Sequence, residues 1–381
     1  MTRSIHVFYD RDYYTLRWLR ALVWGRKAFN ERDVNITFDG FSAPIPKMGT
    51  VLPPITKKED YIKKFSNGKF DIVFLAYHHS LPGLGQLSTS DRIEVLQVVK
   101  KRCNTLVWLD TADSTGTSLF DVMPYVDVYL KKQVLVDRDR YTKPIWGGRI
   151  FCEYYHKKYQ IEDKVVCDRE FPVLDNKYTH KLGISWNVGL GDLFTASRAD
   201  RYFFHRKNYA PLEFTTPSID RPLDVHYRGS VWNNIAGFQR KKAIELIAER
   251  DDIKKPDVSK KVPRDEYIRE SKSTLSLVSP FGWGEICGRD FEAFLYGAAL
   301  IKTDMSHMET YPNIYIKNKT YMAVDWDFEN FNDIIDLVKT KSGREQLLEV
   351  ANNGQNMYRD YMLTYEKKME FADHILSQVI L

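Results

Sequence analysis

The stretch Ser279–Asp304 reads SPFGWGEICGRDFEAFLYGAALIKTD, and it indicates the fold more clearly than any other part of the chain. It follows the apolar run Thr274–Val278, which is typical of a buried strand. Three glycines then fall within seven residues, a helical pattern begins near Arg289, Gly297 ends it, and a short apolar run follows. Strand, glycine-rich turn, helix and strand in this order form the repeating unit of a parallel α/β sheet.

The same alternation of strand and helix runs through the rest of the chain. Phe70–Tyr77 and Thr105–Leu109 are near-continuous apolar runs, typical of strands buried on both faces of a parallel sheet. Other strands are expected at Ile5–Tyr9, Val34–Phe38, Val126–Leu130, Leu223–Tyr227 and Ala299–Lys302, and helices at Tyr13–Phe29, Asp91–Arg102, Gly237–Arg250, Arg289–Tyr296, Phe328–Lys339, Arg344–Tyr361 and Lys367–Val379. This pattern predicts an α/β fold with two Rossmann-like domains that face each other across a cleft.

A proline-containing segment separates the two halves. APLEFTTPSIDRP, residues 210–222, has the composition of a linker. The chain of 381 residues is also long enough for two domains of the usual size, about 100–200 residues each. We therefore expect a first domain at 1–210, a second at 211–365, and a final helix at 366–381.

Composition excludes several classes of protein. A hydrophobic fraction of 43% with 28% charged residues is not that of a disordered chain, and a net charge of +5 is too small to indicate nucleic-acid binding. We find no apolar segment of signal-peptide or membrane-span type. The four cysteines are scattered, without the spacing of a zinc site. We expect a cytoplasmic protein with no metal and no bound cofactor.

The glycine-rich turn before Arg289 has the features of an anion site. Gly284 and Gly288 would let a ligand approach the backbone, and the following helix N-terminus and Arg289 would both attract negative charge. Glu292 lies one helical turn after Arg289, so the two side chains should share a face. The alternative is an ordinary structural strand–turn–helix.

Two further segments of the second half could contribute to the same site. Arg228 and Gly229 follow a predicted strand, where an arginine can hold a phosphate and a glycine can admit it. Arg240 and Lys241 lie in the first turns of a helix, where basic side chains oppose the helix dipole unless an anion binds. The alternatives are a solvated turn and an ordinary charged helix face.

The run Arg289-Asp-Phe-Glu-Ala-Phe-Leu-Tyr-Gly297 resembles the R-x-F-E-A-x-x-x-G motif of GT-B glycosyltransferases, in the C-terminal domain called glycosyl transferases group 1. The resemblance covers roughly residues 220–381. It implies a GT-B architecture in which a nucleotide-sugar, the co-substrate, binds the second domain. It also implies that Glu292 binds the ribose hydroxyls, that Arg289 and the glycine-rich turn serve the diphosphate, and that the last helix crosses back to the first domain.

One departure from the family pattern concerns catalysis. The large retaining group of this superfamily carries two glutamates separated by seven residues, whereas Glu285 and Glu292 are separated by six. Glu285 is therefore a candidate catalytic residue that either replaces the first glutamate on a shifted loop or has no such role. Retention and inversion of the sugar both stay open.

The ends of the predicted strands in the first half carry candidate acceptor-side residues. An inverting transferase needs a general base near the acceptor hydroxyl, and Asp113 and His79 are the leading candidates. Each of these residues could equally be a cap or a turn former. Candidate acceptor-binding residues are His78, Asp10, Gly83 and Trp232, and rim aromatics that could stack on sugar or base are Tyr77, Trp186, Trp232 and Trp283.

The predicted function is transfer of a sugar from a nucleotide-sugar to a saccharide or lipid-linked saccharide, in bacterial surface polysaccharide synthesis, with domain closure before transfer. Basic-aromatic stretches at Arg17–Lys27 and Arg198–Lys207 suggest peripheral contact with the inner face of the membrane, or else partly buried helices. Nucleic acid is not an expected partner. The alternatives are a phage-type transferase acting on DNA bases and a catalytically inactive sugar-binding or scaffold protein.

Overall fold

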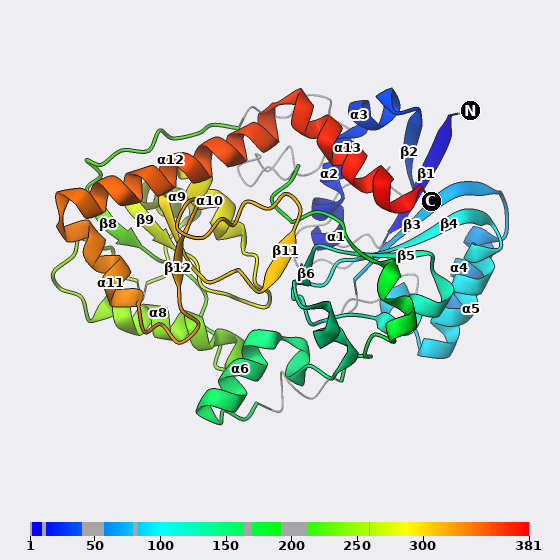
Figure 1. Cartoon of the computed structure of the whole chain (residues 1–381), viewed down its shortest axis with the longest axis horizontal. Coiled ribbons are helices and arrows are strands. Elements are labelled where there is room, and N and C mark those ends of the chain that lie inside the picture. The colour runs from blue at the N-terminus through cyan, green and yellow to red at the C-terminus, as the bar shows by residue number, and fades with distance from the viewer. Residues whose placement is uncertain are drawn as a thin grey trace.

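The computed structural model describes residues 2–9, 13–39, 57–78, 83–163, 170–191, 212–258 and 260–380 (Figure 1). The described chain forms two parallel sheets, one in each half of the sequence, with strand orders β2-β1-β3-β4-β5-β7 and β12-β10-β9-β8. The predicted α/β class, with a parallel sheet in each half, is confirmed.

The first sheet is built around its most apolar strands. Its strands are β1 (Arg3–Tyr9), β2 (Val34–Asp39), β3 (Phe70–Tyr77), β4 (Cys103–Asp110), β5 (Val128–Lys131) and β7 (Leu182–Ile184). β3 and β4 lie in the middle, with Phe74 opposite Val107 and Tyr77 opposite Asp110, so β4 brings a carboxylate to the carboxyl edge of the sheet. That edge is where ligands bind in open parallel sheets.

The helices of the first half are α1 (Tyr13–Trp18), α2 (Arg20–Trp24), α3 (Arg26–Glu31), α4 (Lys58–Phe65), α5 (Thr89–Lys100) and α6 (Ile150–Tyr159). The single helix predicted over Tyr13–Phe29 is wrong, because the chain is interrupted at Leu19 and Gly25. A Cβ on Gly25 would lie 2.9 Å from the ring of Phe371, so the glycine lets the last helix pack closely here. Trp18, Leu19, Ala21 and Leu22 are buried, as expected for the partly buried helix.

The second sheet contains β8 (Leu223–His226), β9 (Thr274–Val278), β10 (Ala299–Thr303) and β12 (Met322–Val324). Its helices are α8 (Phe238–Ala248), α9 (Arg264–Lys272), α10 (Gly288–Tyr296), α11 (Phe331–Asp336) and α12 (Lys341–Leu363). Short 3-10 turns occur at Leu84–Gln86, Phe120–Tyr125, Arg138–Thr142, Trp146–Gly148, Asn176–Lys181, Ile235–Gly237 and Leu337–Lys339. β9 and β10 are completely buried, including the polar side chains of Thr274, Ser276, Lys302 and Thr303.

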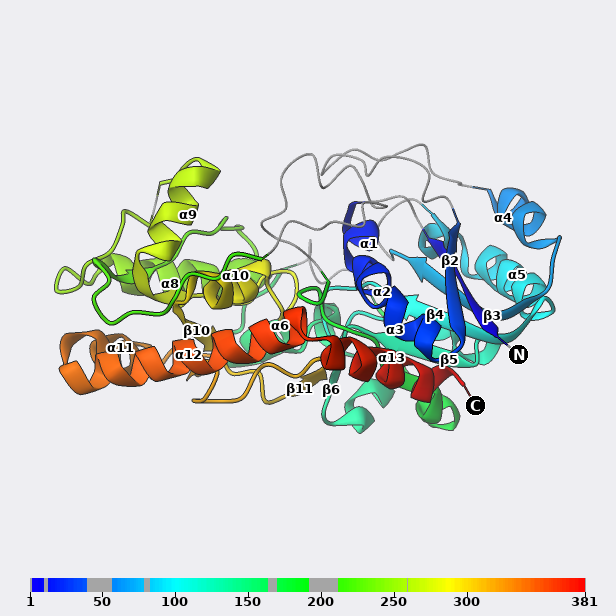
Figure 2. The same cartoon turned by 90° about the horizontal axis from the view of Figure 1, so that it is seen from above.

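The last helix, α13 (Tyr365–Val379), continues from the end of α12 and lies along the first sheet (Figures 1 and 2). The hydroxyl of Thr364 accepts a hydrogen bond from the backbone N–H of Lys367 and caps the new helix. Phe371 packs edge-on against Trp186, and Arg32 of the first half pairs with Asp373 at 2.6 Å.

A small two-stranded sheet joins the two halves of the molecule. β6 (Gln133–Leu135) pairs with β11 (Met308–Thr310) in antiparallel register, with Val134 opposite Glu309. In the described part of the chain, no helix is both long enough and apolar enough to cross a membrane.

Candidate functional site

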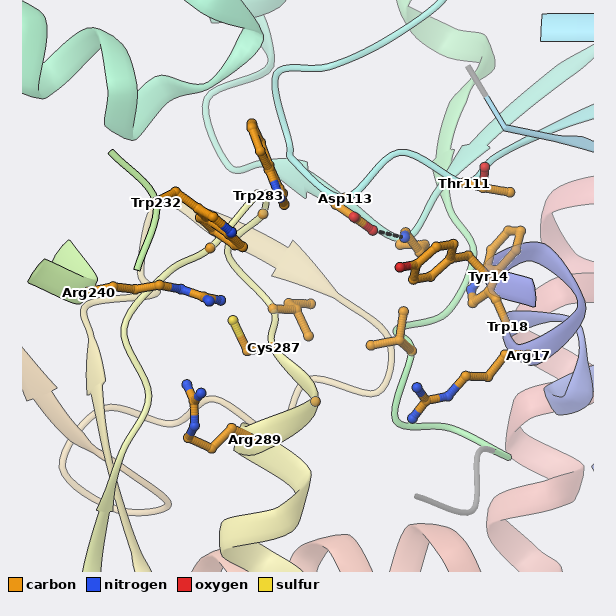
Figure 3. A pocket seen from close by; sticks show the side chains of 16 residues that line it. Tyr14, Arg17, Trp18, Thr111, Asp113, Trp232, Arg240, Trp283, Cys287 and Arg289 are labelled. Atoms are coloured by element: carbon orange, nitrogen blue, oxygen red, sulfur yellow. Dashed lines mark hydrogen bonds and ion pairs between the residues drawn. The ribbon is translucent and has the colours of Figure 1, made fainter. Parts of the chain in front are cut away.

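A cleft of about 330 Å³ lies between the two sheets, and we call it the central cleft (Figure 3). Both halves of the chain line it. The first half contributes Tyr14, Arg17, Trp18, Thr111, Asp113, Lys132 and Val188, and the second contributes Trp232, Arg240, Gly282, Trp283, Gly284, Ile286, Cys287, Gly288 and Arg289. Of the candidates chosen from the sequence, the structure therefore brings Asp113, Trp232, Arg240, Gly284, Gly288 and Arg289 to one place.

The floor of the cleft is the chain Ser279–Cys287, which we call the glycine turn, together with the start of α10. Asp290 anchors this turn, because its carboxylate accepts hydrogen bonds from the Ser279 hydroxyl at 2.5 Å and from the Cys287 backbone N–H at 3.0 Å. Lys302, which is fully buried like Asp290, pairs with that carboxylate at 2.9 Å. The first turn of α10 is thus held in place at the cleft, with the Asp290 backbone N–H bonded to the Cys287 carbonyl at 3.1 Å, and a helix N-terminus attracts anions.

Arg240 and Arg289 are held by backbone carbonyls rather than by carboxylates. Arg240 donates to the carbonyls of Phe281 and Ser230, each at 3.1 Å, and stacks on Trp232 at 4.1 Å from the ring centre. Arg289 donates from Nη2 to the Arg228 carbonyl at 2.7 Å, while its buried Nε and Nη1 have no hydrogen-bond partner among the described residues. Figure 3 shows both guanidinium groups pointing toward the space beside Cys287.

Gly229 is required by this arrangement. A Cβ at that position would lie 2.9 Å from Nη2 of Arg289 and 2.6 Å from the Tyr227 hydroxyl. Any side chain at position 229 would therefore displace the Arg289 guanidinium, which lies over the Tyr227 ring.

A second cavity of about 570 Å³, the side cavity, lies in the second half of the chain. Its walls are Arg228, Gly229, Ser230, Val231, Ile244, Val258, Lys260, Lys261, Val262, Arg264 and Tyr267. Arg228 is neutralised there by Glu270, at 2.5 and 2.7 Å, and this arginine lowers the pKa of the Glu270 carboxyl below its ordinary value. The contact between Gly229 and Arg289 links the side cavity to the central cleft.

Glu292 lies beneath the side cavity and does not line either cavity. Its carboxylate accepts hydrogen bonds from Arg264 and from the Tyr267 hydroxyl, both at 2.5 Å. Burial, reinforced by this carboxylate, raises the pKa of Tyr267 above its ordinary value, so the phenol remains a hydrogen-bond donor. Lys241 is turned away from both cavities and lies 3.9 Å from Glu245 on the exposed face of α8.

Asp113 is the carboxylate that lines the central cleft. It belongs to the loop Thr111–Ser118, the Asp113 loop, in which every other residue is buried. Asp113 itself has a side chain that is 52% exposed, and Lys132 pairs with it at 2.8 Å. Lys132 was not chosen as a candidate from the sequence. The adjacent lysines Lys131 and Lys132 directly follow a predicted strand, which could have indicated that they lie at the carboxyl edge of the first sheet.

Glu285 is completely buried and joins the glycine turn to the Asp113 loop. Its carboxylate accepts hydrogen bonds from the Thr115 hydroxyl at 2.7 Å and the Thr115 backbone N–H at 3.1 Å, and His307 lies 3.9 Å away. Burial alone would raise the pKa of Glu285, but His307 and Thr115 outweigh it and hold that pKa below the ordinary value. The residue therefore lies behind the cleft wall and does not line the cleft.

Among the other first-half candidates, His78 and Gly83 are described and are not among the residues that line the cleft. His78 is buried, with its ring 6.4 Å from that of Tyr14, and Gly83 precedes the 3-10 turn Leu84–Gln86. His79, Asp10 and the stretch Arg198–Lys207 lie outside the described residues. Tyr77 and Trp186 are buried in the core, so their predicted place on a rim is wrong.

The sequence matches no known family model and no curated protein. Similar solved structures include an alpha-glucosyltransferase in complex with UDP and a 13-mer DNA containing a HMU base, with 10% identity, a TM-score of 0.43, and coverage of 98% of this chain and 100% of that chain. Sucrose-phosphate synthase from Thermosynechococcus elongatus has 8% identity and a TM-score of 0.47, with coverage of 99% and 98%.

The structure of TarM has 11% identity and a TM-score of 0.41, and covers 83% of this chain. The alignment spans only 57% of the TarM chain. With TM-scores below 0.5, these similarities do not establish what this protein binds or does.

Proposed function

We propose that the protein is a glycosyltransferase that binds the diphosphate of a nucleotide-sugar at the start of α10, between Arg240 and Arg289. The observation that carries this proposal is that two arginines converge on a helix N-terminus and neither is paired with a carboxylate among the described residues. A cation that is desolvated without a counter-ion destabilises the fold unless an anion binds there.

The charge of the central cleft agrees with an anionic ligand. Arg17, Arg240 and Arg289 line it, while Lys132 is paired with Asp113, the carboxylate among the lining residues. Basic side chains and a helix N-terminus can stabilise the charge that develops on a leaving diphosphate, which is the role a divalent metal has in other enzymes. Among the described residues, no group of three His, Cys, Asp or Glu side chains is placed to hold a metal ion.

The side cavity provides space for the nucleoside. Gly229 in its wall lies against Arg289 of the central cleft, and Val231, Ile244 and Val262 give it an apolar wall. Glu292 lies just behind the wall formed by Arg264 and Tyr267, and its carboxylate would have to exchange one of its bonds to these residues to accept a hydrogen bond from a ribose hydroxyl. This would reproduce the role that the family resemblance implies for Glu292.

The transferred sugar would then lie in the central cleft, facing Asp113. In the reaction, an acceptor hydroxyl oxygen bonds to the anomeric carbon, the bond from that carbon to the phosphate oxygen breaks, and the nucleoside diphosphate leaves with the bonding electrons. Asp113 would accept the hydroxyl proton as general base. Trp232 and Trp283, whose rings lie 5.1 Å apart, offer an aromatic wall suited to a saccharide acceptor.

A thermal-shift screen against UDP, GDP, ADP, CMP and TDP tests the donor site. A nucleotide at 100 times its dissociation constant should stabilise the protein by about 2.7 kcal/mol. Arg289→Ala and Arg240→Ala should lose this shift, whereas Lys241→Ala, on the exposed face of the same helix as Arg240, should keep it. The proposal fails if no nucleotide stabilises the wild-type protein, or if Arg289→Ala responds as the wild type does.

A further inference from the structure

We propose that Lys132 is a positioning residue, which holds the Asp113 carboxylate in place at the central cleft for the acceptor hydroxyl. This proposal rests on the proposed glycosyltransferase function and adds a residue that neither the motif nor the resemblance indicates. Lys132 Nζ lies 2.8 Å from Asp113 Oδ1, at the wall of the cleft opposite Arg240 and Arg289.

Two neighbouring lysine–aspartate pairs join the end of β5 to the end of β4. The inner pair is Lys131 with Asp110, at 2.6 Å and almost fully buried, and Lys131 also donates to the carbonyl of Thr117 at 2.6 Å. The other oxygen of Asp110 accepts the backbone N–H of Ala112 at 2.8 Å, so this pair shapes the turn that leads to Asp113. The outer pair, Lys132 with Asp113, repeats the arrangement at the cleft.

The backbone around the outer pair is fixed on both sides. Gln133 donates a side-chain hydrogen bond to the Asp113 carbonyl, and Glu285 holds Thr115 two residues further on. A Cβ on Gly284 would lie 1.7 Å from the Asp113 carbonyl oxygen, so the glycine turn packs directly against this loop. With the backbone held in this way, the remaining freedom of Asp113 is that of its side chain, and Lys132 restricts it.

Burial makes this ion pair stronger than an ordinary surface pair. The side chain of Lys132 is only 6% exposed, whereas that of Asp113 is 52% exposed. The cation is therefore shielded from solvent screening, while the carboxylate can still be reached by a substrate hydroxyl. An adjacent cation favours the ionised carboxylate, which is the form that accepts a proton.

Other charged groups surround the same loop and remain constant in the test. Those that line the cleft with Asp113 are Tyr14, Arg17, Arg240, Cys287 and Arg289. Those that contact its loop are Asp110, Lys131, Tyr141 and Glu285, with His307 beside Glu285. Because the variants leave all of them in place, a change in pH dependence reports on the Lys132–Asp113 pair.

The experiment compares Lys132→Met and Lys132→Arg with the wild type, using the full chain and a nucleotide-sugar that carries the nucleoside diphosphate identified by the thermal-shift screen. Lys132→Met should lower kcat by at least ten-fold and move the acidic limb of its pH profile to higher pH, because the carboxylate binds a proton more readily without its cation. Lys132→Arg should restore most of kcat. The thermal shift produced by the nucleoside diphosphate should be the same in all three proteins.

A double-mutant cycle with Asp113→Asn identifies the partner through which Lys132 acts. Lys132→Met should cause little further loss of kcat in the Asp113→Asn protein. An equal loss in both backgrounds, an unchanged kcat and pH profile, or loss of diphosphate binding in Lys132→Met would each overturn the positioning role. A wild-type protein that binds no nucleoside diphosphate would instead contradict the proposed function.

Discussion

At the scale of single residues, Arg289 is a residue of the candidate site whose hydrogen bonding is incomplete. Its Nε and Nη1 are buried without hydrogen-bond partners among the described residues, and burying such groups costs about 1–3 kcal/mol each, or more for a charged side chain. A phosphate oxygen would satisfy them. These unsatisfied groups lower the free energy of unfolding, and Arg289 is therefore expected to contribute strongly to diphosphate affinity.

His226, at the end of β8, makes the stability of the protein depend on pH. The ring is fully buried, with Nε2 lying 3.1 Å from Glu270, and burial lowers its pKa from 6.5 to about 4 despite that carboxylate. Below pH 6.5 the unfolded chain takes up a proton at this position, whereas the folded protein does not until about pH 4. This residue therefore lowers the free energy of unfolding as the pH falls through that interval.

His226→Gln should flatten this dependence by up to about 1.4 kcal/mol per pH unit between pH 6.5 and 4. Urea unfolding at a series of pH values measures the slope, and His180→Gln is a control because His180 is exposed. An identical slope in His226→Gln and the wild type would show that His226 does not carry the effect.

Several individual positions could be predicted from the sequence. Gly284, Gly288 and Arg289 were identified from local order alone, because a glycine-rich turn before a helix builds an anion site from adjacent residues. Lys241 and Glu292 could not be placed in the same way, since the direction of a helical side chain relative to a cavity depends on which face the rest of the fold covers.

At the scale of elements, the glycine turn packs against the Asp113 loop, so it lies between the proposed donor site and the proposed acceptor side. A Cβ on Gly284 would meet the backbone of the Asp113 loop, which cannot move without disturbing β4. A Cβ on Gly282 would instead meet the end of the Arg240 side chain at 2.4 Å, which can turn away.

Gly284→Ala should therefore destabilise the protein by about 1–3 kcal/mol and lower kcat, since the backbone that the new methyl group would meet cannot turn away as a side chain can. Gly282→Ala should have the smaller effect on stability and weaken diphosphate binding through Arg240. Chemical denaturation and nucleotide titration of the two variants measure both quantities. A Gly284→Ala protein as stable and active as the wild type would mean that the turn does not rest on the Asp113 loop.

Elements with strong periodicity were predicted well, and those that depend on tertiary partners were not. β3 and β9 begin and end at the predicted residues, because short segments rich in apolar residues between turn residues leave few alternatives. The elements α6 and α9 and the strand pair β6–β11 were not predicted from the sequence. The two strands have only three residues each and exist because they pair with each other across the two halves of the molecule.

At the scale of the whole molecule, the two halves are tied together more extensively than a hinge requires. β6 pairs with β11, Arg138 pairs with Glu309 at 2.9 Å, and the Asn187 side chain donates to the Pro312 carbonyl at 2.9 Å. Glu285 adds a buried carboxylate between the glycine turn and Thr115. Opening the cleft would break these contacts together.

We therefore expect the radius of gyration in solution to change little when a nucleoside diphosphate binds, in contrast to the domain closure anticipated from the sequence. Small-angle X-ray scattering with and without the nucleotide identified by thermal shift measures this. A clear contraction on binding would show that the halves separate in the absence of ligand and that β6–β11 opens.

The order of strands and helices, the glycine turn and the helix that begins at its end are local properties, because each depends on the periodicity of neighbouring residues and on backbone freedom. The role that each of the three candidate acidic residues can have depends instead on the tertiary structure. Asp113 faces the cleft, Glu285 is buried behind it and Glu292 lies beneath a second cavity, since the packing of the two halves determines which carboxylates keep contact with solvent. Sequence spacing places these residues along the chain, but burial and the neighbouring cation decide which of them can take a proton.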